Sequence, residues 1–169
     1  IDEHILDIVT DSNNNSYYLT ALFGGNPLLN NSSVTHYDGR DLLLFSTDCQ
    51  GNIRWSQTIG GYGNGGTAQK LGLDSNGGLY LSIGISSLPS AVSTIPTTFG
   101  SNNNLPFNDG DPFTPSVAGR YGFLLKYNTL NGNLVWRKDF QGDVSINNGS
   151  MDIGPVHVDS QNVVHMILG

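Results

Sequence analysis

Apolar and polar positions alternate in short runs along this chain, and turn residues separate the runs. The clearest alternation lies within residues 5–23, with Tyr17, Leu19, Ala21 and Phe23 in one set and Tyr18, Thr20 and Leu22 in the other. A period of two predicts β-strands. Because both sets are largely apolar, we expect both faces of the resulting sheet to be covered.

A five-residue turn signature occurs three times between such runs. It begins at Asp11, Asp74 and Asp159 and reads Asp-Ser-Asn-Asn-Asn, Asp-Ser-Asn-Gly-Gly and Asp-Ser-Gln-Asn-Val. The strand after each copy carries a ring at the same place, namely Tyr17, Tyr80 and His165. Gly and Asn supply the positive φ that a tight connection needs, so each copy predicts a β-hairpin.

A second kind of hairpin contains a tryptophan and occurs twice. Gly51-Asn52-Ile53-Arg54-Trp55 recurs as Gly132-Asn133-Leu134-Val135-Trp136. The residues before them align without a gap, Leu42-Leu43-Leu44-Phe45 with Phe123-Leu124-Leu125-Lys126. Since the two tryptophans hold equivalent places in the repeat, we expect both to pack between repeat units and not to line a ligand groove.

One repeat unit is therefore hairpin, connection, hairpin, which makes a sheet of four antiparallel strands. Repetition of such a sheet every several tens of residues indicates the blades of a β-propeller. We predict an all-β propeller fragment with a full blade at residues 5–61, a second at 68–142 and a half blade at 150–169. The connection at residues 24–39 is rich in Gly, Asn and Ser and is expected to be a surface loop.

These signatures resemble the β-propeller repeat of secreted and cell-surface bacterial proteins, and the resemblance covers nearly the whole chain. It is carried by Asp74-Ser75-Asn76-Gly77-Gly78-Leu79-Tyr80-Leu81, Phe123-Leu124-Leu125-Lys126-Tyr127 and the second tryptophan hairpin. That hairpin is also similar to the tryptophan-docking repeats of pyrroloquinoline-quinone-type propellers. The chain departs from the family at Asp48 and Cys49, where a plainer turn is usual, and at Val163, where Gly or Asn is expected.

The resemblance implies a non-catalytic binding or structural module that serves adhesion or protein interaction outside the cell. The expected partners are further blades of the same protein and an extracellular protein or glycan ligand. Proteins of this kind often carry a C-terminal sorting domain for type IX secretion, and none is visible in this sequence. The alternative is a fragment of a propeller enzyme, a quinoprotein-like dehydrogenase or a hydrolase, whose active site lies in blades outside this chain.

The second unit differs from the first by a long insertion, residues 86–119, where we expect recognition to take place. Structureless loops longer than about 12 to 15 residues are usually functional or disordered, and aromatic residues among the prolines of this one argue for packing. The predicted ligand-binding residues are Phe99, Asn102, Asn103, Phe107, Asn108, Asp109, Asp111 and Phe113. Their amides and carboxylates suit sugar hydroxyls or peptide backbone. The plainer alternative is that the insertion covers a neighbouring blade or another chain.

Charge and metal-ligand chemistry narrow the possible partners. The net charge is −7 and the seven Lys and Arg are scattered, whereas nucleic-acid binding needs clustered positive charge. Asp109 and Asp111 lack the final bidentate Glu of a calcium loop. The histidines His36, His157 and His165 lack zinc-site spacing, and the last two are expected on opposite strands of one hairpin. We therefore expect no nucleic acid, no metal and no cofactor.

Catalytic and membrane signals are also missing from the sequence. There is no Gly-x-Ser-x-Gly elbow, and no stretch approaches the roughly 20 apolar residues that span a bilayer. The glycine-rich residues 60–66 precede a hairpin and not a helix, so they predict a flexible passage and not a phosphate loop. The single Cys49 offers no disulfide framework, which leaves a buried free thiol or a bond outside this stretch as alternatives. We expect no catalytic residue.

Overall fold

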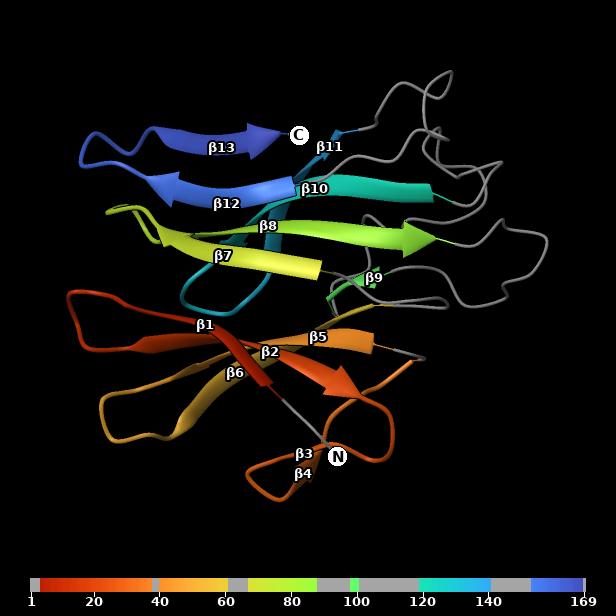
Figure 1. Ribbon diagram of the computed structural model, residues 1–169. Helices are drawn as coiled ribbons and strands as arrows, with labels where there is room; N and C mark the ends of the chain where they lie inside the picture. The colour runs from red at the N-terminus through yellow and green to blue at the C-terminus, as the bar shows by residue number, and fades with distance from the viewer. Residues whose placement is uncertain are drawn as a thin grey trace.

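Every regular element of the chain that the structure describes is a β-strand, as the alternation predicts. The computed structural model describes residues 4–37, 40–60, 67–87, 98–100, 119–140 and 153–168, and no helix occurs among them. All strand pairs in these ranges are antiparallel. The all-β antiparallel class is therefore confirmed, and the described sheets are open (Figure 1).

The first sheet contains the first tryptophan hairpin and the hairpin before it. Its strands are β1 (His4–Thr10), β2 (Ser16–Phe23), β5 (Arg40–Thr47) and β6 (Ile53–Gly60), paired in chain order. A short fifth strand, β9 (Thr98–Phe99), comes from the insertion and pairs with the end of β6. The predicted unit of hairpin, connection and hairpin is thus present, with one strand added at its edge.

The second sheet repeats this order, and a third hairpin follows it. The second sheet consists of β7 (Thr67–Leu73), β8 (Gly78–Ser87), β10 (Gly119–Asn128) and β11 (Leu134–Phe140), and the third hairpin of β12 (Ile153–Val158) and β13 (Val164–Leu168). His157 pairs with His165 across the third hairpin, which confirms their expected places on opposite strands.

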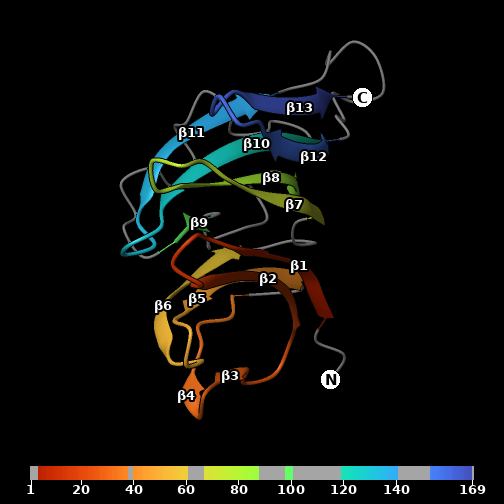
Figure 2. The same cartoon turned by 90° about the vertical axis from the view of Figure 1, so that its left-hand side faces the viewer.

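The first and second sheets pack face to face around the main core (Figure 2). The first sheet contributes Tyr17, Leu19, Leu42, Leu44 and Trp55, and the second contributes Leu79, Leu81, Ile83, Phe123, Leu125 and Tyr127. Nearly all of these side chains are fully buried. A smaller core with Tyr80, Leu124 and Val156 joins the opposite face of the second sheet to the third hairpin.

Trp55 connects the first sheet directly to the second. Its indole N–H donates to the carbonyl oxygen of Thr129 at 3.0 Å, in the turn between β10 and β11. A Cβ atom at Gly132 in that turn would lie 2.5 Å from the Trp55 ring, so only glycine leaves room for the indole. Trp136 is half-buried beside Tyr80, with ring centroids 5.9 Å apart.

The first strands of the three units lie side by side in the order β1, β7, β12 (Figure 1). The carboxylate of Asp7 on β1 accepts the backbone N–H of Leu71 on β7 at 2.8 Å. On the other side of β7, a Cβ atom at Gly72 would come within 2.9 Å of a methyl group of Val158 on β12. The three units therefore approach one another closely along their first strands.

The turns of the Asp signatures share one geometry, and Val163 fits it. In each turn the fourth residue has positive φ: 61° at Asn14, 84° at Gly77 and 63° at Asn162. Val163 is the fifth residue, so the departure from Gly or Asn at this place leaves the turn type unchanged. Asp48 starts a fourth turn of this form, with Gly51 at φ 85°.

Three details differ from what the sequence predicts. Trp55 pairs with Ser46, whereas Trp136 pairs with Lys126, so the gapless alignment of the two units is wrong by one residue. The cause is the length of the β10–β11 turn. There the backbone N–H of Asn128 donates to the carbonyl oxygen of Asn133, whereas in the β5–β6 turn the N–H of Asp48 donates to the carbonyl oxygen of Asn52, so the β10–β11 turn is one residue longer. The connection at residues 24–39 also contains a small hairpin, β3 (Leu28–Leu29) with β4 (Ser32–Ser33). Cys49 is an exposed free thiol and not a buried one, because it lies in a hairpin turn.

Candidate functional site

The two ends of the sheets carry different kinds of chain connection. The tight hairpin turns lie together at the left of Figure 1, and the connections between hairpins leave from the opposite end, where β2, β6, β8 and β11 finish. Both ends of the insertion, at Ser86 and Gly119, are therefore at the connection end. Because connections carry most binding residues in repeat scaffolds, a binding site is expected at this end.

The structure places one of the predicted ligand-binding residues, and it is buried. Phe99 lies in β9 with 3% of its surface exposed and belongs to the core between the first two sheets. The other predicted residues lie outside the described residues, namely Asn102, Asn103, Phe107, Asn108, Asp109, Asp111 and Phe113. The potential calcium ligands Asp109 and Asp111 are among them.

Phe99 links the two sheets. Its ring centroid is 5.1 Å from that of Phe123, and the Arg137 guanidinium lies 5.4 Å from the ring centre. Its carbonyl oxygen accepts the hydroxyl proton of Tyr127 at 3.0 Å, and burial raises the pKa of Tyr127 well above its usual value. This part of the insertion thus packs onto a neighbouring sheet, as the plainer interpretation of the insertion expects.

A small cavity opens directly beside β9. It has a volume of about 160 Å³ and is lined by Ser33, Val34, Thr35, Tyr37, Ser56, Gln57, Thr58 and Gly100. These residues come from β4 and the connection after it, from β6 and from the insertion. The cavity therefore lies where three separate segments of the chain meet.

The lining of this cavity is polar and uncharged. Hydroxyl groups and one amide can each donate and accept hydrogen bonds, and none of the described lining residues is charged. Thr58 donates its hydroxyl proton to the Thr35 carbonyl oxygen at 2.8 Å, which ties the connection to β6. Such a surface suits a neutral ligand rich in hydroxyl or amide groups.

Gly100 brings the backbone of the insertion against this cavity. Its φ is +121°, and a Cβ atom there would lie 2.8 Å from the side-chain oxygen of Gln57. Only glycine accommodates both the backbone conformation and the close approach. The insertion therefore contacts the cavity at Gly100.

A buried carboxylate holds Tyr37 at the cavity. Asp41 is fully buried and accepts the backbone N–H of Tyr37 at 2.6 Å. His36 lies 3.9 Å from the same carboxylate oxygen and accepts the backbone N–H of Gly24 at 3.2 Å. Gly60 faces the Asp41 carboxylate, which would overlap any side chain there. The connection at residues 24–37 is thus anchored at both ends.

Sequence reasoning missed this cavity because no motif marks it. Its hydroxyls are ordinary Ser and Thr residues that become neighbours only when residues 33–37 fold back onto β6. The sequence of β6 gives no clear signal, because polar residues occur in both of its alternating sets of positions: Arg54, Ser56 and Thr58 in one, and Gln57 in the other.

The carboxylates at the hairpin end are structural. In Asp74, one oxygen accepts backbone N–H groups from Asn76 and Gly78, and the other accepts from Tyr80 and Lys126. Burial alone would raise the pKa of Asp74, but these hydrogen bonds outweigh burial and lower it. Hydrogen bonds likewise outweigh burial at Asp11 and lower its pKa. In the third turn, the Asp159 carboxylate contacts the His165 ring at 2.9 Å in place of a tyrosine hydroxyl.

Metal clusters and membrane helices are not found in the described ranges. There, no group of three His, Cys, Asp or Glu side chains comes together in a way that could hold a metal ion. No helix in the part of the chain that the structure describes is long and apolar enough to cross a membrane.

Comparisons with known proteins assign no family. No protein-family model matches the chain, and a search of curated proteins found none that matches it significantly. The likeness of the hairpin signatures to propeller repeats therefore stays a prediction from the residues themselves.

Proposed function

We propose that this chain is part of a β-propeller that works as a non-catalytic binding module of a secreted or cell-surface bacterial protein. Its role would be adhesion or protein interaction. The strand order supports the propeller: each full unit is a four-stranded meander, and the first strands of successive units lie together as they would around an axis. The secreted location rests on the resemblance of the hairpin signatures alone.

The single observation that carries the binding role is the uncharged cavity at the connection end. It combines hydroxyl groups from β6 and the connection with Gly100 of the long insertion. At about 160 Å³ it is smaller than the 300–1,000 Å³ typical of pockets for drug-sized ligands, so it fits one sugar ring or one side chain of a larger partner. A glycan or a peptide segment of an extracellular protein satisfies this chemistry.

The lining also favours binding over hydrolysis. A hydrolase needs a carboxylate pair, a nucleophile with its base, or a metal-bound water facing the substrate. The cavity instead presents neutral hydroxyl and amide groups, which orient a ligand by hydrogen bonds. The binding module is therefore the function that this geometry supports best.

A binding screen with one matched pair of variants tests the proposal. The chain is applied to arrays of glycans and of immobilised extracellular proteins. Ser33→Arg fills the cavity from an exposed position, and Ser12→Arg makes the same change at an exposed turn on the opposite end. We expect at least one ligand that Ser33→Arg weakens and Ser12→Arg does not. A screen without ligands, or equal binding by both variants, contradicts the proposal.

A further inference from the structure

A second cavity lies next to the one described above. Its volume is about 140 Å³, against about 160 Å³ for the first. Ser33, Val34 and Ser56 line both cavities, so the two are neighbours. The first, here called cavity A, reaches toward the end of β6 at Thr58, and the second, cavity B, toward its start at Ile53. Together they form one groove along the strand, here called the β6 groove.

The wall of cavity B opposite β6 is a tight hairpin. Asn30 and Asn31 connect β3 to β4 with φ of 49° and 63°, the positive values that a two-residue hairpin turn needs. After β4, the backbone N–H of Val34 donates to the Pro27 carbonyl oxygen at 2.9 Å. The hairpin is therefore closed by its own hydrogen bonds beside the cavity.

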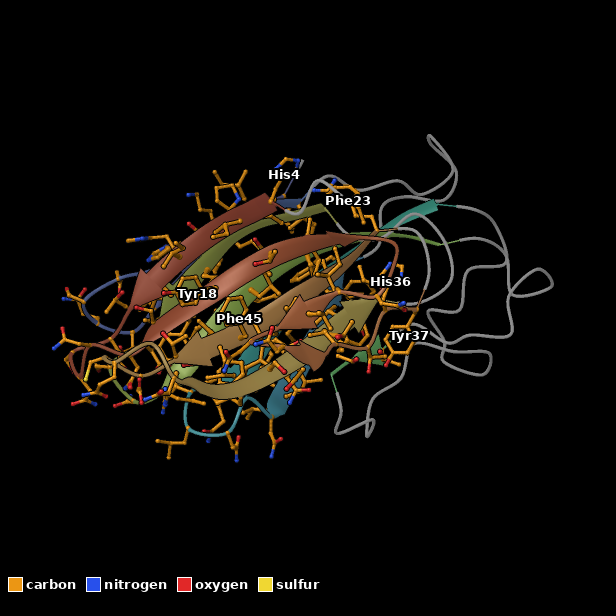
Figure 3. The ribbon with its side chains drawn as sticks, turned by 90° about the horizontal axis from the view of Figure 1, so that it is seen from below. His4, Tyr18, Phe23, His36, Tyr37 and Phe45 are labelled. Carbon is orange, nitrogen blue, oxygen red and sulfur yellow. The ribbon has the colours of Figure 1, made fainter. Side chains whose placement is uncertain are left out.

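The wall of cavity A is fixed by side chains of the first sheet. Thr58 on β6 donates to the Thr35 carbonyl oxygen, and the buried Asp41 accepts the backbone N–H of Tyr37. Figure 3 shows His36 and Tyr37 together at the end of the sheet from which the connections leave. Because both walls are already held in place, a ligand pays little entropy for ordering them.

The two cavities differ in what lines them. Cavity A has the buried Gln57 and Thr58 beneath the exposed Ser33 and Ser56, so its lining offers mainly hydroxyl and amide groups. Cavity B shares the same two serines but adds apolar surface, which comes from Leu29, Val34 and Ile53. The β6 groove thus suits a ligand that carries hydroxyl groups all along its length and an apolar face at one end.

Charge and burial narrow the class of ligand. None of the described residues that line either cavity is charged, and the chain carries a net charge of −7, which repels acidic ligands. A charged side chain of a peptide would lose water here without gaining a counter-charge. An aliphatic side chain in cavity A would cover hydroxyl and amide groups without offering them a hydrogen-bond partner. Sugar rings meet both demands, since they combine neutral hydroxyl groups with C–H faces.

We propose that the β6 groove binds two consecutive rings of a neutral glycan, one ring in each cavity. The bond between the rings lies at the boundary that Ser33, Val34 and Ser56 form. This inference rests on the proposed binding role and names the ligand class of the same site.

A series of oligosaccharides of increasing length tests the two-ring groove. The 169-residue chain is titrated with neutral glucose, galactose and mannose oligosaccharides of one, two and three rings, and backbone amide shifts are followed by nuclear magnetic resonance. Each hydrogen bond of a second ring raises affinity by a factor of about two to ten. We expect a disaccharide of at least one series to bind about tenfold tighter than its monosaccharide, with new shifts at Asn30 and Ser32. Equal affinities for one and two rings would overturn the two-ring groove and leave binding at cavity A intact.

Ser32→Arg closes cavity B alone. Ser32 is exposed, pairs with Leu29 across the hairpin, and lines cavity B but not cavity A. Ser12→Arg makes the same change of charge and size at the opposite end. We expect Ser32→Arg to reduce the disaccharide affinity to that of the monosaccharide, and Ser12→Arg to change neither. If Ser32→Arg weakens one-ring and two-ring ligands equally, or weakens neither, the second ring does not lie in cavity B.

The ligand class has its own test. A disaccharide of the same series in which one ring carries a carboxylate should bind at least about tenfold more weakly than the neutral one, because no cation faces it. Tighter binding of the acidic disaccharide would overturn the neutral class. A protein ligand that Ser33→Arg weakens, together with no binding of any oligosaccharide, would overturn the glycan assignment while the binding role stands.

Discussion

Truncation of Trp55 is the sharpest test of how the sheets are held together. The side chain is 8% exposed, packs in the main core, and donates its N–H to the Thr129 carbonyl at 3.0 Å. Loss of a buried Trp side chain costs about 3 to 5 kcal/mol, so Trp55→Ala should lower the free energy of unfolding by that amount. Trp136 is half-buried, and its truncation should cost roughly 2 kcal/mol or less.

Trp55→Phe separates the hydrogen bond from the packing. Phenylalanine keeps an aromatic ring in the core but removes the N–H donor, which leaves the Thr129 carbonyl without the indole. A buried polar group that loses its partner costs about 1 to 3 kcal/mol. Urea unfolding followed by circular dichroism measures all three variants without depending on tryptophan fluorescence. Equal losses for Trp55→Ala and Trp136→Ala, or a neutral Trp55→Phe, would refute the sheet-to-sheet role of the indole.

Three further predictions concern Phe99, Gly132 and the carboxylates of the Asp turns. Phe99→Ala should destabilise the chain by about 3 to 5 kcal/mol in thermal or urea unfolding, because the ring is buried between the sheets. Gly132→Ala should also destabilise it measurably in the same assay, since the new methyl group meets the indole and the φ of 72° disfavours alanine. The folded-state pKa values of Asp11 and Asp74 lie below their usual 3.8, so their contribution to stability is present above that pH and is lost as the pH falls through the lowered values. Unfolding measured as a function of pH should show this loss below about pH 4, and Asp74→Asn should flatten it.

The hairpins could be predicted because their signals are local. The Asp signatures require positive φ at one place, and Asn14, Gly77 and Asn162 supply it within the same five residues. A strand on either side of such a turn needs only alternating apolar residues. Since each strand pairs with its neighbour in the sequence, the order of the four strands could also be predicted. Asp48 went unrecognised as a fourth copy because its turn lacks the Ser that marks the others.

What could not be predicted depends on contacts between distant segments. Because the β10–β11 turn has one additional residue, the counterpart of Ser46 in the second unit is Lys126 and not Tyr127. A shift of one residue along a strand moves every side chain to the opposite face of the sheet. The pairing of Thr98 and Phe99 with β6 joins segments that no local pattern connects. The cavity has the same origin, since its hydroxyls gather only after residues 33–37, β6 and Gly100 meet.

The face-to-face packing of successive sheets is the central claim, and one nuclear Overhauser measurement tests it directly. In a sample with isotope-labelled glycine and tryptophan, the account predicts cross-peaks between the Trp55 indole ring and the α-protons of Gly132, because the ring lies so close to this glycine that an added Cβ atom would be only 2.5 Å from it. Cross-peaks from Trp55 to residues of its own sheet alone would contradict the stacked arrangement.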